Sequence, residues 1–80
     1  MERIEKAFGI VLRERREKLR LSQEEFADKA GIHRTYVSSI ERGKVRVSIE
    51  IAEKLAIAVE TPLSVIWRQI ERRRDSQQSP

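Results

Sequence analysis

Residues 21–43 read LSQEEFADKAGIHRTYVSSIERG and contain the signals for two short helices. The first part of this stretch predicts a short helix, because the Ser22 hydroxyl can accept from backbone N–H groups while Glu25, three residues later, can reach back to complete a capping box. Gly31 stands where a residue with positive φ would end that helix. The apolar residues of its inner face are Phe26, Ala27 and Ala30.

The second part, residues 32–42, predicts another short helix, which ends before Gly43. Two short helices joined by a tight turn with a Gly form a helix-turn-helix. That geometry requires a small residue at the helix crossing, a Gly at the turn and branched apolar residues on the inner face of the second helix. The chain meets these requirements with Ala27, Gly31, Val37 and Ile40.

Three further helices are predicted outside this unit. Residues 3–20 form an amphipathic run, Ser48 caps a second, and Thr61-Pro62 starts a third that continues into the low 70s. No run alternates with period two, so strands are not expected. The prediction is an all-α, compact five-helix domain at residues 1–74 with a flexible tail at 75–80. The apolar stripe of the first run is Ile4, Phe8, Val11, Leu12 and Leu19.

Composition excludes several classes of protein. The 80 residues suffice for one domain and leave no room for a small-molecule effector domain. The chain has no Cys and one His, so neither a disulfide framework nor a metal or other cofactor is expected. Its apolar runs are far shorter than the roughly 18 to 20 residues that cross a bilayer, and its charged start does not resemble a signal peptide. We therefore expect a cytoplasmic protein without membrane contact.

Charge gives the first indication of a partner. Lys and Arg outnumber Asp and Glu by 17 to 13, and residues 32–47 hold four bases and one acid, whereas residues 48–67 hold one base and three acids. A compact basic patch favours a polyanion such as nucleic acid. A solvated surface in a chain with 38% charged residues would give similar patches, so charge alone leaves both interpretations open.

The segments Leu21 to Ala27 and Tyr36 to Gly43 together resemble the lambda-repressor-like, Cro-type helix-turn-helix family. The match covers residues 8–70 and includes the family-typical runs Ser-Gln-Glu-Glu-x-Ala and Ser-x-Ile-Glu-Arg-Gly in register. The small size and the stretch 33–38 further resemble the controller proteins of restriction–modification operons. The chain departs from the family at residues 59–62, where Val-Glu-Thr-Pro replaces the usual Leu-Gly and Ser-Pro turn.

The resemblance implies a transcriptional regulator, such as a repressor, that binds double-stranded operator DNA with residues 32–42 as the recognition helix in the major groove. Arg34 is the strongest candidate for reading a base, because its guanidinium matches O6 and N7 of guanine, while Thr35 can offer a hydroxyl or a methyl group to thymine. Arg34 can also be merely solvated, and His33 either reaches the DNA or caps the turn. The candidate base-contacting residues are His33, Arg34, Thr35 and Ser38.

Phosphate contacts position a protein without reading sequence, and the free N–H groups at a helix start suit them. Two candidates have alternatives, since Ser22 also serves as a helix cap and the Tyr36 ring either packs against the preceding helix or contacts a phosphate. The run from Arg72 to Arg74 is left outside the site, because a basic helix end also satisfies the helix dipole. The candidate phosphate-contacting residues are Ser22, Gln23, Tyr36, Ser39, Arg42, Lys44 and Arg46.

A homodimer is expected, because one helix in one groove contacts only a few base pairs. Two-fold pairing would set the recognition helices about 34 Å apart and favour a palindromic operator. Trp67 is the candidate anchor, since Trp is enriched at interface centres; alternatively, it closes the core of the monomer against the first helix. The candidate interface consists of Leu63, Ile66, Trp67 and Ile70.

By resemblance, Arg16 and Glu41 occupy the places of an ion pair that ties the first helix to the end of the third. The expected guanidinium-to-carboxylate distance is within about 4 Å. The alternatives are that Arg13 or Arg15 takes this role, or that both charges are solvated.

Two other functions compete with DNA binding. Catalysis would need a nucleophile with a base, paired carboxylates in a cleft or a metal cluster, and a single His supplies none of these, so an enzyme is not expected. A protein-interaction module, such as an antitoxin or partner-binding regulator, is the alternative, because the same fold can be reused without DNA. Such a module would more often place apolar residues on the exposed face of the recognition helix.

RNA binding is disfavoured by the lack of a platform of exposed aromatic residues.

Overall fold

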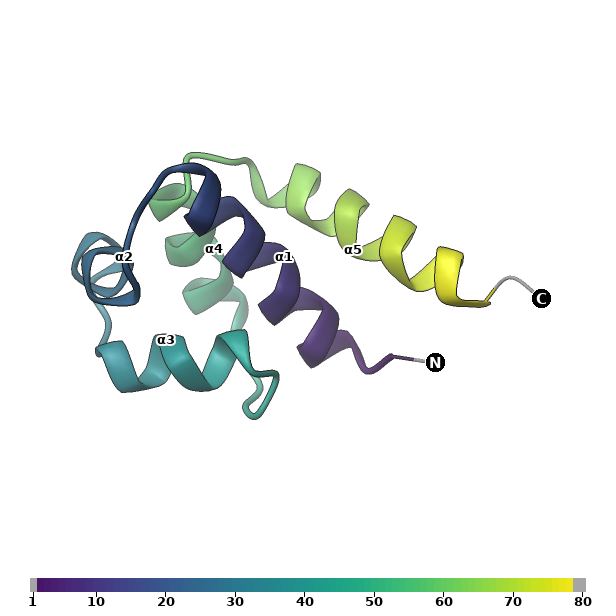
Figure 1. Ribbon diagram of the computed structural model, residues 1–80, viewed down its shortest axis with the longest axis horizontal. Helices are drawn as coiled ribbons and strands as arrows, with labels where there is room; N and C mark the ends of the chain where they lie inside the picture. The colour runs from purple at the N-terminus through teal and green to yellow at the C-terminus, as the bar shows by residue number, and fades with distance from the viewer. Residues whose placement is uncertain (1, 79–80) are drawn as a thin grey trace.

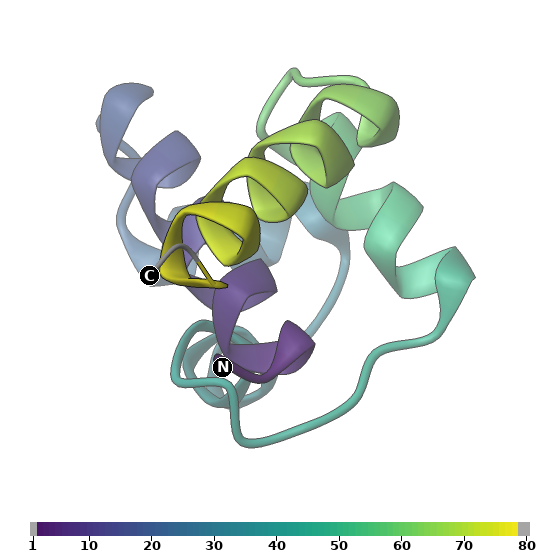
Figure 2. The same ribbon diagram turned by 90° about the vertical axis from the view of Figure 1, so that its right-hand side faces the viewer.

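The computed structural model describes residues 2–78, and within that range it contains five α-helices and no strand (Figure 1). Both views show α1 and α5 running side by side, with α3 on the other side of α1 (Figure 1, Figure 2). The predicted all-α, five-helix fold is confirmed. The helices are α1 (Ile4–Lys18), α2 (Gln23–Ala30), α3 (Arg34–Glu41), α4 (Ile49–Ala58) and α5 (Leu63–Gln78).

The start and end of α2 have the geometry that the sequence predicts. The Ser22 Oγ accepts from the Glu25 N–H at 3.0 Å, and the Glu25 carboxylate accepts from the Ser22 N–H at 2.8 Å, which completes the capping box. The hydrogen bond from the Ser22 backbone holds the pKa of Glu25 below its ordinary value. Gly31 adopts φ 70°, a conformation that is strained for a residue with a Cβ atom, and it turns the chain into α3.

α3 and α4 also begin at capping side chains. α3 begins at Arg34, two residues later than predicted, because the His33 Nδ1 accepts from the Thr35 N–H at 3.1 Å and caps the helix. The structure therefore realises the capping alternative for His33. The prediction for α4 is confirmed, since the Ser48 Oγ accepts from the Ile51 N–H at 3.1 Å.

The turn between α4 and α5 differs from the prediction by one residue. Thr61 does not cap α5, because its side chain is buried and its hydroxyl donates to the backbone carbonyl two residues earlier at 3.0 Å. The Pro62 carbonyl accepts from the Ile66 N–H at 3.2 Å, so Pro62 is the residue just before the helix and not its first residue. Glu60 adopts φ 54°, the left-handed conformation that the family's usual Gly would favour at this position.

α5 continues to Gln78, past the end that the sequence predicts in the low 70s. Residues 75–78 are therefore helical, while residues 79 and 80 lie outside the described residues. Contacts with the start of the chain hold this part of α5, because the Glu2 carboxylate accepts from the Arg73 Nε at 2.7 Å and from the Gln77 Nε2 at 3.3 Å. The bond from Arg73 lowers the pKa of Glu2. The domain boundary at residue 74 stays a prediction.

The core lies around α1, which packs against α3 and α5, while α2 packs against α3 and α4 and α4 packs against α5. The predicted inner faces of these helices supply most of the core. Ile4 and Leu19, at the two ends of the predicted α1 stripe, are 38% and 37% exposed and contribute only in part. The buried hydrophobic residues are Ala7, Phe8, Val11, Leu12, Phe26, Ala27, Ala30, Val37, Ile40, Ala52, Leu55, Ala56, Ala58, Val59, Ile66 and Ile70.

The crossing of α1 over α3 depends on Gly9. A Cβ atom at this position would lie 2.7 Å from the Glu41 carbonyl oxygen and would also collide with the Ile40 carbonyl oxygen. Both are backbone atoms, which side-chain rotation cannot move away. The close approach therefore explains a residue of low helix propensity inside α1.

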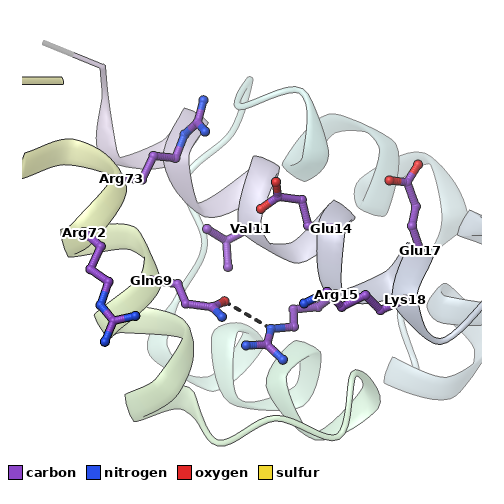
Figure 3. Close-up of a pocket in the computed structure, with 8 residues that line it drawn as sticks. All are labelled: Val11, Glu14, Arg15, Glu17, Lys18, Gln69, Arg72 and Arg73. Atoms are coloured by element: carbon purple, nitrogen blue, oxygen red, sulfur yellow. Dashed lines mark hydrogen bonds between the residues drawn. The ribbon is translucent and has the colours of Figure 1, made fainter. Parts of the chain in front are cut away.

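α1 and α5 also meet across an open groove, which Figure 3 shows in close-up. Gln69 reaches from α5 toward Arg15 of α1, and the Arg15 Nε donates to the Gln69 Oε1 at 3.1 Å (Figure 3). The other residues that line this groove are Val11, Glu14, Glu17, Lys18, Arg72 and Arg73.

Candidate nucleic-acid interface

The four candidate base-contacting residues lie together at the start of α3 and on its outer side. Arg34 and Thr35 occupy the first turn and are exposed, and Ser38 lies one turn further on and is partly buried. His33 is exposed and is held at the same helix end by its capping hydrogen bond. Among the described residues, Arg34 has no ion-pair or hydrogen-bond partner for its side chain. The outer side of α3 is thus polar and positively charged.

The end of α3 is fixed by the ion pair that the family resemblance predicts. The Arg16 Nε and Nη2 donate to the two Glu41 carboxylate oxygens at 2.7 and 2.9 Å, with the side chains 10% and 2% exposed. The hydrogen bond to Glu41 raises the pKa of Arg16. The prediction is confirmed, and the alternatives are wrong, because Arg13 pairs with Glu17 and Arg15 bonds to α5.

The start of α2 is joined to the same carboxylate. The Gln23 Nε2 donates to the Glu41 Oε1 at 3.1 Å, and the Arg16 Nη1 donates to the Leu21 carbonyl at 2.8 Å. Gln23 was a candidate phosphate contact, and the structure gives it a partner within the protein. This network holds the first residue of α2 in place relative to the end of α3. No sequence pattern indicates the bond between Gln23 and Glu41, because the two residues lie on different helices.

The cationic candidates follow α3 in the link to α4. Arg42, Lys44 and Arg46 are exposed, and Figure 1 shows this link as a loop at the end of α3 away from α2. The Arg46 side chain is 89% exposed, and its Nε lies 3.8 Å from the Glu5 carboxylate. This ion pair is therefore loose and open to solvent.

The three remaining phosphate candidates differ in exposure. Ser22 is exposed and acts as the α2 cap, whereas Ser39 is partly buried on α3. Tyr36 is partly buried and packs against the hydrophobic core. A phosphate contact by these residues stays a prediction.

The candidate dimer interface needs a correction. Ile66 and Ile70 are 0% and 1% exposed, because they face the core of the monomer, so the prediction that they are available for pairing is wrong. Leu63 is partly buried against the core. Trp67 is 40% exposed, and its ring centroid lies 6.5 Å from that of Phe8 on α1. Trp67 therefore covers the monomer core with one side and meets solvent with the other.

The structure exposes other apolar side chains that the sequence analysis assigned to no site. Ile49 and Ile57 on α4 are 84% and 69% exposed. Ile49 and Trp67 line an apolar groove of about 260 Å³ together with Ile4, Phe8 and Val47. The available signal was the composition of α4, which carries apolar residues at more positions than one buried face requires.

Two further observations concern residues 2–78 only. No three of their His, Cys, Asp and Glu side chains lie close enough together to hold a metal ion. None of their helices has the length and apolarity that crossing a bilayer requires.

Known proteins match this chain closely in sequence and structure. The helix-turn-helix family matches residues 12–66. The control protein C.MunI of Mycoplasma sp is 42% identical over 73 residues, which are 90% of this chain and 99% of that protein. The solved structure of the restriction-modification controller protein C.AhdI from Aeromonas hydrophila has a TM-score of 0.73 and 38% identity, covering 82% of this chain and 94% of that one.

A third likeness concerns a protein solved on DNA. The restriction-modification controller protein C.Esp1396I, solved as a tetramer in complex with its natural 35 base-pair operator, has a TM-score of 0.82 and 24% identity. The likeness covers 90% of this chain and 95% of that one. At this identity it shows a shared fold.

Proposed function

Because the chain belongs to the helix-turn-helix family, we propose that it is a restriction–modification controller that binds operator DNA as a homodimer, with α3 in the major groove. The observation that carries the proposal is the outer side of α3, which presents Arg34 and Thr35 to solvent at its first turn. The relative that matches nearly the full length of both chains, C.MunI, is a control protein. Helix-turn-helix control proteins are regulators and not enzymes, and such a regulator acts in the cytoplasm, with its DNA.

In this proposal the first turn of α3 reads bases. The Arg34 guanidinium donates to O6 and N7 of a guanine, and Thr35 and Ser38 offer hydroxyl groups to neighbouring base edges. His33 accepts a backbone N–H through its Nδ1 atom, which leaves the other side of its ring to face the DNA.

Phosphate contacts on both sides of α3 set its position in the groove. Ser22 and Gln23 lie at the start of α2, while Arg42, Lys44 and Arg46 lie beyond the end of α3. The buried pair of Arg16 and Glu41 supports this arrangement, because it fixes these two regions relative to each other before DNA binds. Tyr36 and Ser39, both partly buried, contribute contacts at the edge of the interface.

The proposed dimer pairs two copies through the exposed apolar side of α4 and α5. Ile49, Ile57 and Trp67 replace the buried Ile66 and Ile70 as its central residues, and Leu63 lies at its edge. A contiguous exposed apolar patch indicates an interaction surface, and Ile49 and Trp67 line one apolar groove with Ile4, Phe8 and Val47. A second copy is the expected occupant, because a palindromic operator requires two recognition helices related by two-fold symmetry.

The proposed DNA binding is tested by measuring the affinity of the protein for a fluorescent random-sequence duplex at several salt concentrations. We expect binding at low salt that weakens steeply as salt rises. Each DNA phosphate that the protein neutralises releases counterions and contributes about 0.9 to the steepness of log affinity against log salt. A folded protein that does not bind duplex at low salt would favour the protein-interaction alternative instead.

The dimer is tested by sedimentation equilibrium on Ile49→Gln and Ile57→Gln variants. Both side chains are largely exposed in the monomer, so these changes should leave its fold intact. Leu19→Gln is the matched control, because Leu19 is an exposed apolar residue directly after α1. We expect weaker dimerisation for the α4 variants alone. Equal association of all three variants and the parent protein would show that the interface lies elsewhere.

A further inference from the structure

The first turn of α1 adds positive charge beside the link that follows α3. Figure 2 shows the start of α1 next to the end of α3 and the link. Side chains from the two segments line one open groove of about 400 Å³. The sequence alone does not show that these segments meet, because they are about forty positions apart in the chain. The cations that line the groove are Arg3, Lys6, Arg42, Lys44 and Arg46.

The two segments are in direct backbone contact. A Cβ atom at Gly43 would lie 2.7 Å from the Lys6 Cα, so the first turn of α1 packs against the turn that ends α3. Lys6 is thereby held next to Gly43, and the exposed side chains of Lys6 and Lys44 line the same groove. Within residues 2–78, Lys6 forms no ion pair. Lys6 adds to the larger effect of Arg73 in lowering the pKa of Glu2, and its exposed side chain can also meet an anion outside the protein.

Two carboxylates, Glu2 and Glu5, line this groove, and Glu5 pairs with its guanidinium groups. Glu5 lies 3.4 Å from Arg3 and 3.8 Å from Arg46, which come from opposite sides of the groove. The Glu5 side chain is 19% exposed, whereas those of Arg3 and Arg46 are 75% and 89% exposed. The other carboxylate of the groove, Glu2, is bound to Arg73. Glu5 is thus the acid that competes for the two guanidinium groups.

We propose that Arg3 and Lys6 contact operator phosphates together with the cations of the link, and that Glu5 competes with the phosphates for Arg3 and Arg46. This inference rests on the proposed function. The row of cations continues the phosphate-binding link onto α1, so one protomer would contact a longer stretch of the DNA backbone. Arg46 must leave the Glu5 carboxylate when it moves to a phosphate. The loss of this ion pair lowers the affinity for DNA below the value that the charge of Arg46 alone would give.

The role of Lys6 is tested by measuring duplex affinity as a function of salt for Lys6→Ala. Arg72→Ala is the control, because it removes one exposed cation from α5, on the other side of α1 from α3 (Figure 1). We expect Lys6→Ala to lower the salt slope by about one, so that the loss of affinity between 50 and 200 mM salt shrinks by about fourfold, equally for specific and random duplexes. We expect no such change for Arg72→Ala.

The role of Glu5 is tested by measuring the duplex affinity of Glu5→Gln. Glu14→Gln is the control, because it removes the same charge from the groove between α1 and α5. Glu5→Gln should raise duplex affinity several-fold and steepen the salt slope, whereas Glu14→Gln should change both much less. A purely structural role of Glu5 would not produce this increase in affinity.

The outcomes separate this inference from the proposed function. If the parent protein binds no duplex, the proposed function fails. A different result would overturn only the phosphate contacts of α1. In that case the parent protein binds duplex and Lys44→Ala lowers the salt slope. Lys6→Ala then behaves like its control Arg72→Ala, and Glu5→Gln behaves like its control Glu14→Gln.

Discussion

Glu41 at the end of α3 and Arg16 on α1 are joined by hydrogen bonds of 2.7 and 2.9 Å at a position that is nearly closed to solvent. Because Gln23 donates to the same carboxylate, one side chain links the first three helices. The two helices of the helix-turn-helix are therefore held to α1 by polar contacts as well as by the apolar core.

Removing one partner of this pair should destabilise the fold strongly. Glu41→Ala leaves the Arg16 guanidinium buried without its carboxylate, and we expect a loss of about 3 kcal/mol in the free energy of unfolding. The double variant Arg16→Met, Glu41→Leu leaves no unpaired charge and should recover most of this loss. Urea unfolding followed by circular dichroism measures both. A Glu41→Ala variant as stable as the parent would contradict the buried pair.

Gly9 and Gly31 should respond differently to the same change to Ala. Gly9→Ala places a Cβ atom against the backbone of α3 and should cost about 2 kcal/mol or more, although Ala favours a helix by about 1 kcal/mol. Gly31 has open space around it but a φ of 70°, so Gly31→Ala should cost only about 1 kcal/mol. Urea midpoints of the two variants give the comparison. A stabilised Gly9→Ala variant would show that the helices do not approach this closely.

The contact between Glu2 and Arg73 should make stability depend on pH. Since Arg73 lowers the pKa of Glu2 in the folded chain, the carboxylate stabilises the fold above its ordinary pKa, and this contribution is lost as pH falls through the lowered value. Glu2→Gln should therefore be less stable than the parent near about pH 6, and the difference should vanish near about pH 2. Glu5 and Glu25, whose pKa values are also lowered, are present in both proteins and cancel in the difference. A difference that is constant with pH would exclude this ion pair.

Local signals in the sequence were sufficient to predict the five helices and the caps of α2 and α4. Ser22, Gly31 and Ser48 act through backbone groups within three or four residues, so their roles do not depend on the rest of the fold. The pair of Arg16 and Glu41 followed from the family resemblance and not from spacing alone. The end of α5 was predicted too early, because Glu2, which bonds to Arg73 and Gln77, lies at the other end of the chain.

The sites depended on information that periodicity does not contain. The apolar pattern of α5 groups Ile66, Trp67 and Ile70, but it does not show whether this face meets the core or a second copy. In the structure the two Ile residues are buried in the core of the monomer, and part of Trp67 meets solvent. Lys6 and Lys44 likewise come to line one groove only through the packing of α1 against the turn after α3.

Arg34 and Arg46 should affect DNA binding in different ways. If Arg34 reads a guanine, Arg34→Ala should cost about 1–3 kcal/mol at the preferred site and relax the preference at one base pair. Arg46→Ala should lower affinity for all sequences and reduce the salt slope. Competition binding with the preferred and the random duplex measures both effects. Equal losses on the two duplexes for Arg34→Ala would show that Arg34 contacts only phosphate.

The most direct test of the proposed function is selection of bound duplexes from a random pool at a fixed salt concentration of about 0.1 M. Recognition by a symmetric pair of α3 helices predicts enrichment of two inverted half-sites whose centres lie about 10 base pairs apart. The same selection with Arg34→Ala should lose one base preference in each half-site. A pool that shows no enrichment, or that yields only single asymmetric sites, would contradict the proposed function.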